Sequence, residues 1–208
     1  MIADLVSFDV LHPQPLLIVI SGPSGVGKDS VLRSLKKRNT SLYFVVTCAS
    51  RPPRPDEVNG VDYHFVSKEQ FEQMIARGEM IEYANVYNEY KGIPKFEIVN
   101  AIASGKDTVV RLDVQGASSI RKLYPGAILI FLIPESYEVW YHRLQNRKTE
   151  TQESLRVRLE TAREEMRRID EFDYVVVNAE NRLEEAVDTI LAIITAEHHR
   201  IPHRKITG

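Results

Sequence analysis

Residues 16–30 read LLIVISGPSGVGKDS, and this stretch decides the fold of the chain. It begins with a continuous apolar run, which is typical of a strand buried on both faces of a sheet. The spacing Gly-x-x-x-x-Gly-Lys follows from Gly22 to Lys28, and a helical pattern begins at Ser30. A glycine-rich loop between a buried strand and a helix is the context of a phosphate-binding P-loop. The stretch therefore predicts an α/β fold that binds a nucleotide at this loop.

The residue types in this loop suit a nucleoside triphosphate. Glycines let the backbone approach closely, so that successive N–H groups point at phosphate oxygens. The helix that follows adds a favourable dipole for anions, and Lys28 is expected to reach the β- and γ-phosphates. The predicted ATP-binding residues of this segment are Gly22, Pro23, Ser24, Gly25, Val26, Gly27, Lys28, Asp29 and Ser30.

The residue after Lys28 departs from the usual P-loop. Asp29 stands where a serine or threonine commonly offers its hydroxyl to Mg²⁺. A carboxylate is also a hard oxygen ligand, so Mg²⁺ remains the expected cofactor. Because Ser30 could supply the hydroxyl instead, both Asp29 and Ser30 are candidate metal ligands.

Strand and helix patterns alternate along the rest of the chain. Further apolar runs that predict buried strands occupy residues 109–112, 127–133 and 174–177. Helical patterns occupy residues 30–37, 101–104, 117–123, 152–168 and 183–199. Buried strands that alternate with helices indicate crossover units around a parallel sheet. We therefore expect a P-loop NTPase three-layer sandwich, in which helices cover both faces of a central parallel sheet.

The composition is that of a folded domain and argues against several classes of protein. A chain of 208 residues, 43% hydrophobic and 27% charged, fits one domain with inserted subdomains. A net charge of −2 argues against a general nucleic-acid-binding protein. No apolar run approaches the roughly 20 residues that cross a bilayer, so no membrane partner is expected. The single cysteine, Cys48, rules out a disulfide within the chain.

Both ends of the chain carry weak structural signals. Residues 1–14 are expected to form a loose N-terminal tail, and residues 199–208 a C-terminal tail. The N-terminal segment contains no basic residue, so it is expected to be neither a secretory signal nor an arginine-rich transit peptide. We expect a cytoplasmic protein, or one of an organelle stroma or matrix, that is a monomer or a homodimer.

Residues 47–95 break the strand–helix rhythm. Prolines at the start of this segment precede an alternating strand pattern at residues 61–66. Ser67, with Gln70 three residues later, is a capping-box signature for a helix, and residues 80–86 predict another strand. The segment therefore predicts a small mixed α/β subdomain inserted into the parallel body.

Two arginines of this subdomain are candidates for binding a phosphate. Arg51 and Arg54 lie three residues apart among prolines, which limit backbone freedom before a ligand arrives. Two guanidinium groups held in this way suit a doubly charged monophosphate, and Tyr63 can donate its hydroxyl to the same group. The alternative is a solvated basic loop.

Three blocks of the sequence resemble guanylate kinase. They are SRPPRPDEVNGVDYHFV at residues 50–66, IEYA at residues 81–84 and DVQGA at residues 113–117. Together with the P-loop they keep the order and spacing of that family. The resemblance implies a guanylate kinase-like domain over residues 15–198, with a GMP-binding subdomain over residues 47–95 and a lid over residues 137–160.

The resemblance also implies the reaction. A guanylate kinase transfers the γ-phosphoryl group of ATP to GMP, with dGMP as a second acceptor, and gives ADP and GDP in purine nucleotide metabolism. The transfer is expected to be in line and Mg²⁺-assisted, without a covalent intermediate.

Glu82 is the candidate residue for recognising the base. Guanine presents its N1–H and its N2 amino group side by side, and one carboxylate can accept both, whereas adenine has no such pair. A buried carboxylate left unpaired is costly, so a site of this kind discriminates strongly. The alternative for Glu82 is a surface carboxylate at a strand end. With the residues that the resemblance adds, the predicted GMP-binding set is Thr47, Arg51, Arg54, Glu57, Tyr63, Glu82, Lys91 and Asp113.

The lid is rich in arginine. Arg143 and Arg147 are four residues apart in a helical pattern, so they share one face. In guanylate kinases, which this segment resembles, three arginines close over the ATP phosphates, and such a lid neutralises charge and excludes water. The resemblance also implies that Asn178 lies near the adenine. The predicted catalytic residues are Lys28, Arg51, Arg143, Arg147 and Arg158.

Three positions depart from the family pattern. The family often has Tyr-Gly-Ser/Thr where this chain has Lys91-Gly92-Ile93, and Ile93 cannot donate a hydrogen bond. Arg111 stands where the family has an acidic residue near the metal, and Asp29 can offset this change, because a carboxylate is lost at one position and gained at the other. The plant organellar branch resembles this chain at these places, which indicates a subtype.

Two other functions remain open. One is a different P-loop small-molecule kinase, such as ribose 1,5-bisphosphate kinase, whose acceptor needs no residue like Glu82. The other is a non-catalytic guanylate-kinase-like binding module, which typically has a degraded P-loop, whereas Lys28 is present here.

Overall fold

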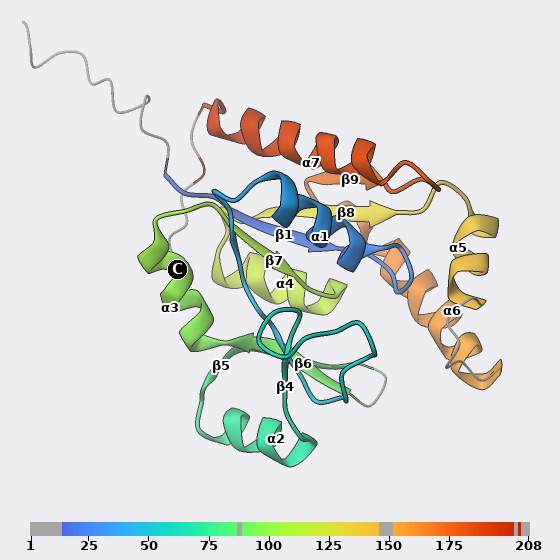
Figure 1. Ribbon diagram of the computed structural model, residues 1–208, viewed down its shortest axis with the longest axis horizontal. Coiled ribbons are helices and arrows are strands. Elements are labelled where there is room, and N and C mark those ends of the chain that lie inside the picture. The colour runs from blue at the N-terminus through green and yellow to red at the C-terminus, as the bar shows by residue number, and fades with distance from the viewer. Residues whose placement is uncertain (1–13, 87–88, 146–151, 202–203, 205–208) are drawn as a thin grey trace, which may run out of the picture.

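The protein is described by a computed structural model over residues 14–86, 89–145, 152–201 and 204. Within this part of the chain, five parallel strands form the central sheet in the order β2–β7–β1–β8–β9 (Figure 1). They are β1 (Leu17–Ser21), β2 (Tyr43–Phe44), β7 (Thr108–Arg111), β8 (Ile128–Ile133) and β9 (Tyr174–Val177). The expected α/β fold with a central parallel sheet is confirmed.

Strand β1 lies in the middle of this sheet and is buried on both faces. Ile18 and Ile20 belong to one hydrophobic cluster, and Leu17 and Val19 belong to a second cluster on the opposite face. Successive side chains of a strand point to opposite faces, so a strand covered on both sides needs apolar residues at every position. This is the physical reason for the continuous apolar run that begins at residue 16.

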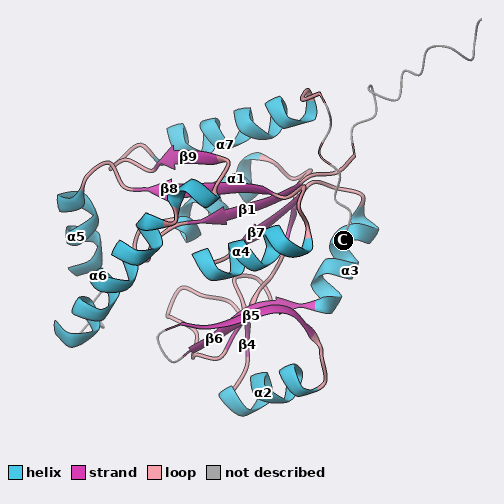
Figure 2. Ribbon diagram, turned by 180° about the vertical axis from the view of Figure 1, so that it is seen from behind, coloured by secondary structure: helices cyan, strands magenta, loops and turns pink. Residues whose placement is uncertain are grey.

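Helices cover both faces of the central sheet. The first hydrophobic cluster includes side chains of α1 (Lys28–Arg38) and α7 (Leu183–His198). The second includes side chains of α3 (Lys95–Ser104) and α4 (Val114–Leu123). Figure 1 shows α1 and α7 on the near side of the sheet, and Figure 2, seen from behind, shows α4 in front of it. The three layers are therefore helix, sheet and helix.

A second, mixed sheet lies beside the central one (Figure 1). Its strands have the order β4–β3–β6–β5, and β3 pairs parallel with β4 but antiparallel with β6. They are β3 (Cys48–Ala49), β4 (His64–Phe65), β5 (Met80–Val86) and β6 (Glu89–Pro94). Helix α2 (Lys68–Ala76) packs on this sheet through Phe71, which contacts the small core of Cys48 and Met80.

The elements predicted in this subdomain are present, but one strand is shorter than predicted. The capping box of α2 is present, because the Gln70 backbone N–H donates to the Ser67 hydroxyl and the Ser67 N–H donates to the Gln70 side chain. The strand expected over residues 61–66 is shorter and covers only His64–Phe65. Its first residues form a turn instead, in which the Asp62 N–H donates to the carbonyl of Val58.

Helices α5 (Tyr137–Gln145) and α6 (Gln152–Arg167) lie at one end of the molecule, followed by the short 3-10 helix η2 (Ile169–Glu171) (Figure 1). The indole N–H of Trp140 in α5 donates to the carbonyl of Ser24 over 2.7 Å, so α5 contacts the P-loop. In α6, Ala162 is buried in the same cluster as Ile18. Arg147, predicted as catalytic, and residues 1–13 of the expected N-terminal tail lie outside the described residues.

Two further observations concern the remaining sequence expectations. In the described part of the expected C-terminal tail, the guanidinium of Arg204 donates to the carboxylate of Glu197 over 2.8 Å. Among the described helices, none combines the length and the apolar character that crossing a membrane requires.

The close approach of the P-loop to β8 depends on Gly22. This residue has φ 134°, and a Cβ at this position would overlap the carbonyl oxygen of Leu132. We predict that Gly22→Ala lowers the free energy of unfolding by about 3 kcal/mol, because either the loop or β8 must move. Gly105→Ala is the matched control, since Gly105 has φ 63° but no atom near its Cβ position, and about 1 kcal/mol is expected there. Urea unfolding measures both, and equal losses would contradict the prediction.

Candidate active site

A cleft between the central sheet and the second sheet contains most of the predicted site residues. It is lined from one side by the P-loop and the start of α1, and from the other side by β5, β6 and the segments that flank β3. The predicted residues that line it are Ser24, Gly25, Gly27, Lys28, Asp29, Ser30, Thr47, Arg51, Arg54, Tyr63, Glu82, Lys91, Asp113 and Arg158. Segments far apart in the sequence therefore meet in one cleft.

The side chain of Lys28 folds back onto the P-loop that precedes it in the sequence. Its ammonium group donates to the carbonyls of Gly22 and Pro23, the latter over 3.0 Å. Burial lowers the pKa of Lys28 to about 8, against the opposing effect of the nearby Glu165 and Asp29 carboxylates. A cation held at the centre of a loop of this kind is a binding point for phosphate oxygens.

Glu57 fixes the orientation of Arg51. Its carboxylate accepts two hydrogen bonds from the Arg51 guanidinium, over 2.6 and 2.7 Å, and a third from the backbone N–H of Arg54 over 2.8 Å. The Glu57 side chain is only 5% exposed. It therefore lies behind the arginine, and its predicted contact with GMP stays a prediction. The guanidinium of Arg51 also lies 5.1 Å from the centre of the Tyr63 ring.

Glu82 is a buried carboxyl group on the wall of the cleft. Burial raises its pKa to about 8, and the negative charge of Asp113 adds to this effect. Its Oε1 is buried and has no hydrogen-bond partner among the described residues. A group in this state is ready to pair with donors of a ligand, because an unsatisfied buried acceptor gains most from a partner.

The DVQGA block explains how Glu82 is accommodated. Asp113 caps the N-terminus of α4, where its Oδ1 accepts from the N–H of Gly116 over 2.9 Å. A Cβ at Gly116 would lie 3.2 Å from Oε2 of Glu82, so the glycine lets helix α4 pack closely against the carboxyl group. Thr47, also buried, lines the same cleft.

The departures at positions 91 and 93 have different consequences. Lys91 lines the cleft, and burial lowers its pKa, although Asp113 opposes this effect. Ile93 is fully buried in the hydrophobic cluster under β1. A hydroxyl is thus replaced by apolar packing at Ile93, whereas Lys91 remains available to an anion.

Two arginines of the segment predicted as a lid contact the P-loop and the loop after β9. Arg158 of α6 donates to the hydroxyl of Ser24 over 3.0 Å, and Arg143 of α5 donates to the carbonyl of Asn178 over 3.0 Å. The side-chain amide of Asn178 donates to the carbonyl of Val26 over 2.7 Å. The loop after β9, the lid helices and the P-loop are therefore joined by hydrogen bonds.

Five residues that line the cleft are not among the predicted site residues, namely Glu89, Gly92, Arg111, Leu112 and Glu165. Arg111 forms an ion pair with Asp29, and the exchange of charges at these positions was the signal that pointed to it. Glu165 of α6 also lines the cleft, where burial raises its pKa to about 7 and the charge of Lys28 opposes the increase. Its helix mixes acids and bases throughout, so no local pattern separates Glu165 from the solvated residues around it.

The residues at the start of α1 fit a magnesium ion that also binds substrate phosphates. Asp29 and Ser30 both line the cleft. Although burial raises the pKa of Asp29, the charges of Arg111 and Lys28 outweigh burial and hold this pKa below its usual value, so the carboxylate is ionised. The described residues contain no cluster of three or more acidic, histidine or cysteine side chains that could hold a metal. Mg²⁺ commonly binds through one or two carboxylates, with phosphates and water completing its shell.

The comparisons with known proteins agree on one family. The family model for guanylate kinase matches residues 14–197. Guanylate kinase 2, chloroplastic/mitochondrial, from Oryza sativa subsp. japonica is 52% identical over 195 residues, which cover 93% of this chain and 68% of that protein. Guanylate kinase from Halalkalibacterium halodurans is 44% identical over 183 residues, which cover 88% of this chain and 89% of that protein.

Solved structures show the same fold. The crystal structure of guanylate kinase from Anaplasma phagocytophilum matches with a TM-score of 0.75 and 28% identity, and covers 91% of this chain and 89% of that chain. A sugar kinase from a Janibacter species matches with a TM-score of 0.51 and 15% identity, over 87% of this chain and 95% of that one. The second likeness concerns the fold alone.

The raised pKa of Glu82 makes stability depend on pH. Because this carboxyl group has a folded-state pKa of about 8 and an ordinary unfolded value of 4.5, it destabilises the fold progressively as pH rises between these values. Glu82→Gln is neutral and of similar shape, so it lacks this effect. We predict that at about pH 9 the variant is more stable than the wild type by more than about 1 kcal/mol, and that the difference shrinks towards pH 5.

Urea unfolding at several pH values measures this difference. Glu79→Gln is the control, because Glu79 is half exposed and pairs with Arg77 at the surface. A difference between wild type and Glu82→Gln that does not vary with pH would contradict the raised pKa.

Proposed function

The chain belongs to the guanylate kinase family and transfers the γ-phosphoryl group of ATP to GMP, and we propose that the two nucleotides meet in the cleft between its two sheets. One observation carries the proposal. The buried carboxyl group of Glu82 and the P-loop ammonium of Lys28 line the same cleft, and four arginines line it as well. One cleft therefore contains a carboxyl group that can recognise the base, cations that can bind the acceptor phosphate, and a P-loop that can bind the triphosphate.

Glu82 recognises the guanine of the acceptor. As a carboxylate it accepts hydrogen bonds from N1–H and the N2 amino group, and Thr47 and Asp113 assist from the same wall. Pairing with two donors favours the charged form of Glu82, so GMP binding releases a proton below about pH 8. The affinity for GMP therefore increases as pH rises towards 8.

Cations hold the acceptor phosphate. Arg51 is oriented by its two hydrogen bonds to Glu57, so its free edge needs no further ordering when the phosphate arrives. Arg54 and Lys91 add positive charge, and Tyr63 donates its hydroxyl. This arrangement directs an acceptor oxygen of GMP towards the P-loop.

The donor is held by the P-loop and the lid. Backbone N–H groups of residues 22–30 and the ammonium of Lys28 bind the β- and γ-phosphates. Arg158 and Arg143, together with the predicted Arg147, neutralise charge on the migrating group, and Asn178 lies by the adenine. Catalysis then consists of alignment and charge stabilisation, and no covalent intermediate is needed.

Asp29 and Ser30 are the residues that would hold magnesium. When bound, the ion neutralises the charge that develops on the β- and γ-phosphate oxygens. Asp29 is ionised in the cleft, as a metal ligand must be.

Two points of the sequence interpretation stay predictions. dGMP is expected as a second acceptor, and the chain is expected to be a monomer or a homodimer. The rice relative is named chloroplastic/mitochondrial, which supports an organelle stroma or matrix, whereas a cytoplasmic location remains the other expectation.

An acceptor panel tests the function directly. ADP release with ATP as donor is measured for GMP, dGMP, AMP, UMP and ribose 1,5-bisphosphate. We expect GMP to give the highest kcat/KM, and Glu82→Gln to lower kcat/KM for GMP by about a hundredfold or more while KM for ATP changes little, because the amide cannot accept both guanine donors.

Glu79→Gln controls for loss of an acid on the surface near β5. Equal rates with AMP and GMP would contradict recognition by Glu82. A preference for ribose 1,5-bisphosphate would favour the sugar-phosphate alternative, and absence of turnover with every acceptor would favour a binding module.

The role of Lys28 gives a second test. We predict that Lys28→Ala lowers kcat by about a thousandfold, because the charge that stabilises the transferring phosphoryl group is lost, while the Kd for GMP stays within about threefold. Lys37→Ala, on the exposed side of the same helix, is the control. Steady-state kinetics and calorimetry measure the two quantities, and unchanged turnover would remove Lys28 from the mechanism.

A further inference from the structure

Arg111 lies where the donor and acceptor parts of the cleft meet, and the mechanism above does not use it. It is the last residue of β7, it lines the cleft, and its side chain is 10% exposed. One terminal nitrogen of its guanidinium donates to the carboxylate of Asp29, in the first turn of α1. The other donates to the backbone carbonyl of Asp62 over 2.8 Å. One side chain thus connects the P-loop helix with the loop that precedes β4.

The same guanidinium contacts the ring of Tyr63. Its central carbon lies 4.1 Å from the ring centre, closer than that of Arg51 at 5.1 Å. Tyr63 is itself only 8% exposed. A desolvated cation over an aromatic ring is attracted by the ring's negative face, so Arg111 restricts the positions that Tyr63 can take.

We propose that Arg111 is a positioning residue for the acceptor phosphate, which it serves by holding Tyr63 through contacts anchored on Asp29 and on the Asp62 carbonyl. The inference rests on the proposed function, because it needs the Tyr63 hydroxyl to bind the phosphate of GMP. An arginine suits this place better than a lysine, since its planar fork serves two acceptors in fixed directions and still presents a face to the ring.

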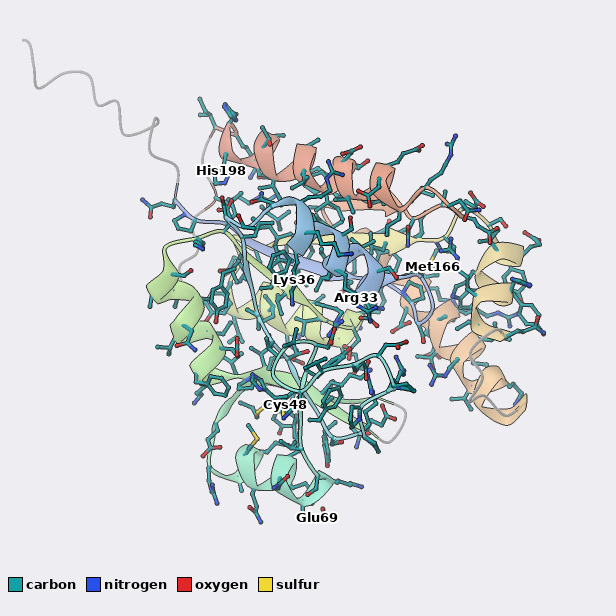
Figure 3. The ribbon with its side chains drawn as sticks, viewed as in Figure 1. Arg33, Lys36, Cys48, Glu69, Met166 and His198 are labelled. Carbon is teal, nitrogen blue, oxygen red and sulfur yellow. The ribbon has the colours of Figure 1, made fainter. Side chains whose placement is uncertain are left out.

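Two cationic side chains of α1 contact the same loop, but they are less buried than Arg111. Lys36 donates to the carbonyl of Val61 over 3.2 Å, and Arg33 lies 3.9 Å from the carboxylate of Asp62. Figure 3 shows both residues on the side of α1 that faces the second sheet. The Arg33 side chain is 52% exposed, and exposed ion pairs contribute little. The buried Arg111 therefore dominates the attachment of the loop.

The ion pair also explains why two departures from the family pattern occur together. A guanidinium at position 111 without a counter-charge would lie unpaired beside the cationic P-loop, and an unpaired buried charge is strongly unfavourable. Asp29 supplies that counter-charge from 82 positions earlier in the sequence. The pair leaves no net charge where donor and acceptor meet.

A double-mutant cycle on GMP binding tests the proposal, with calorimetry on the full chain and neither ATP nor metal present. Arg111→Lys keeps the charge but loses the fork, and Tyr63→Phe keeps the ring but loses the hydroxyl. We expect each to raise the Kd for GMP about tenfold, and the double variant to raise it by little more than tenfold, because both changes remove the same hydrogen bond. The Kd for an ATP analogue stays within about twofold in Arg111→Lys. Arg38→Lys is the control, since Arg38 pairs with Glu184 and Asp188 away from the cleft.

The direction in which Asp29→Ala changes the affinity for GMP distinguishes a positioning role of Arg111 from a charge effect. Loss of the anchor predicts weaker GMP binding, whereas a pure charge effect predicts tighter binding, because a negative charge near the phosphate disappears. This variant also decides the matter if Arg111→Lys does not fold.

An unchanged Kd in Arg111→Lys, an additive hundredfold loss in the double variant, or tighter GMP binding by Asp29→Ala would each overturn the proposal. Failure of the wild type to bind GMP would instead contradict the proposed function.

Discussion

The site depends on the parallel pairing of β1 with β7 on one side and β8 on the other. Parallel strands end at the same edge of a sheet, and ligands bind outside their carboxyl ends. The P-loop follows β1, and Arg111 and Asp113 stand at the end of β7, so the pairing brings them together at one edge.

Charges in the cleft are arranged in pairs before any substrate binds. Arg51 is held by Glu57, and Arg111 by Asp29, so two cations of the cleft have fixed directions. Ordering these long side chains in advance reduces the entropy that binding would otherwise lose. Glu82 differs, because burial raises its pKa and the charge of Asp113 adds to the increase. In the proposed function, the phosphate therefore meets cations that are already oriented, and the base meets a carboxyl group whose Oε1 has no partner among the described residues.

The positions that depart from the family pattern fall into two physical classes. Asp29 and Arg111 compensate each other through direct contact, so the electrostatics near the phosphate path are rebuilt from different side chains. Ile93 instead leaves the polar surface and packs in the core under β1. Asp29, Arg111 and Lys91, the remaining departure, line the cleft, whereas Ile93 is not among its lining residues.

Much of the fold and the P-loop could be predicted because their signals are local. The apolar run of β1, the capping box of α2 and the spacing from Gly22 to Lys28 are each patterns within a few consecutive residues. The ion pair of Arg111 with Asp29 and the hydrogen bond of Arg158 to Ser24 join residues 82 and 134 positions apart. The sequence by itself determined the strands and helices that have strong local patterns and most residue types of the cleft, although not Glu165. Only the tertiary structure decided which charges pair, because that depends on distances between segments that no local pattern encodes.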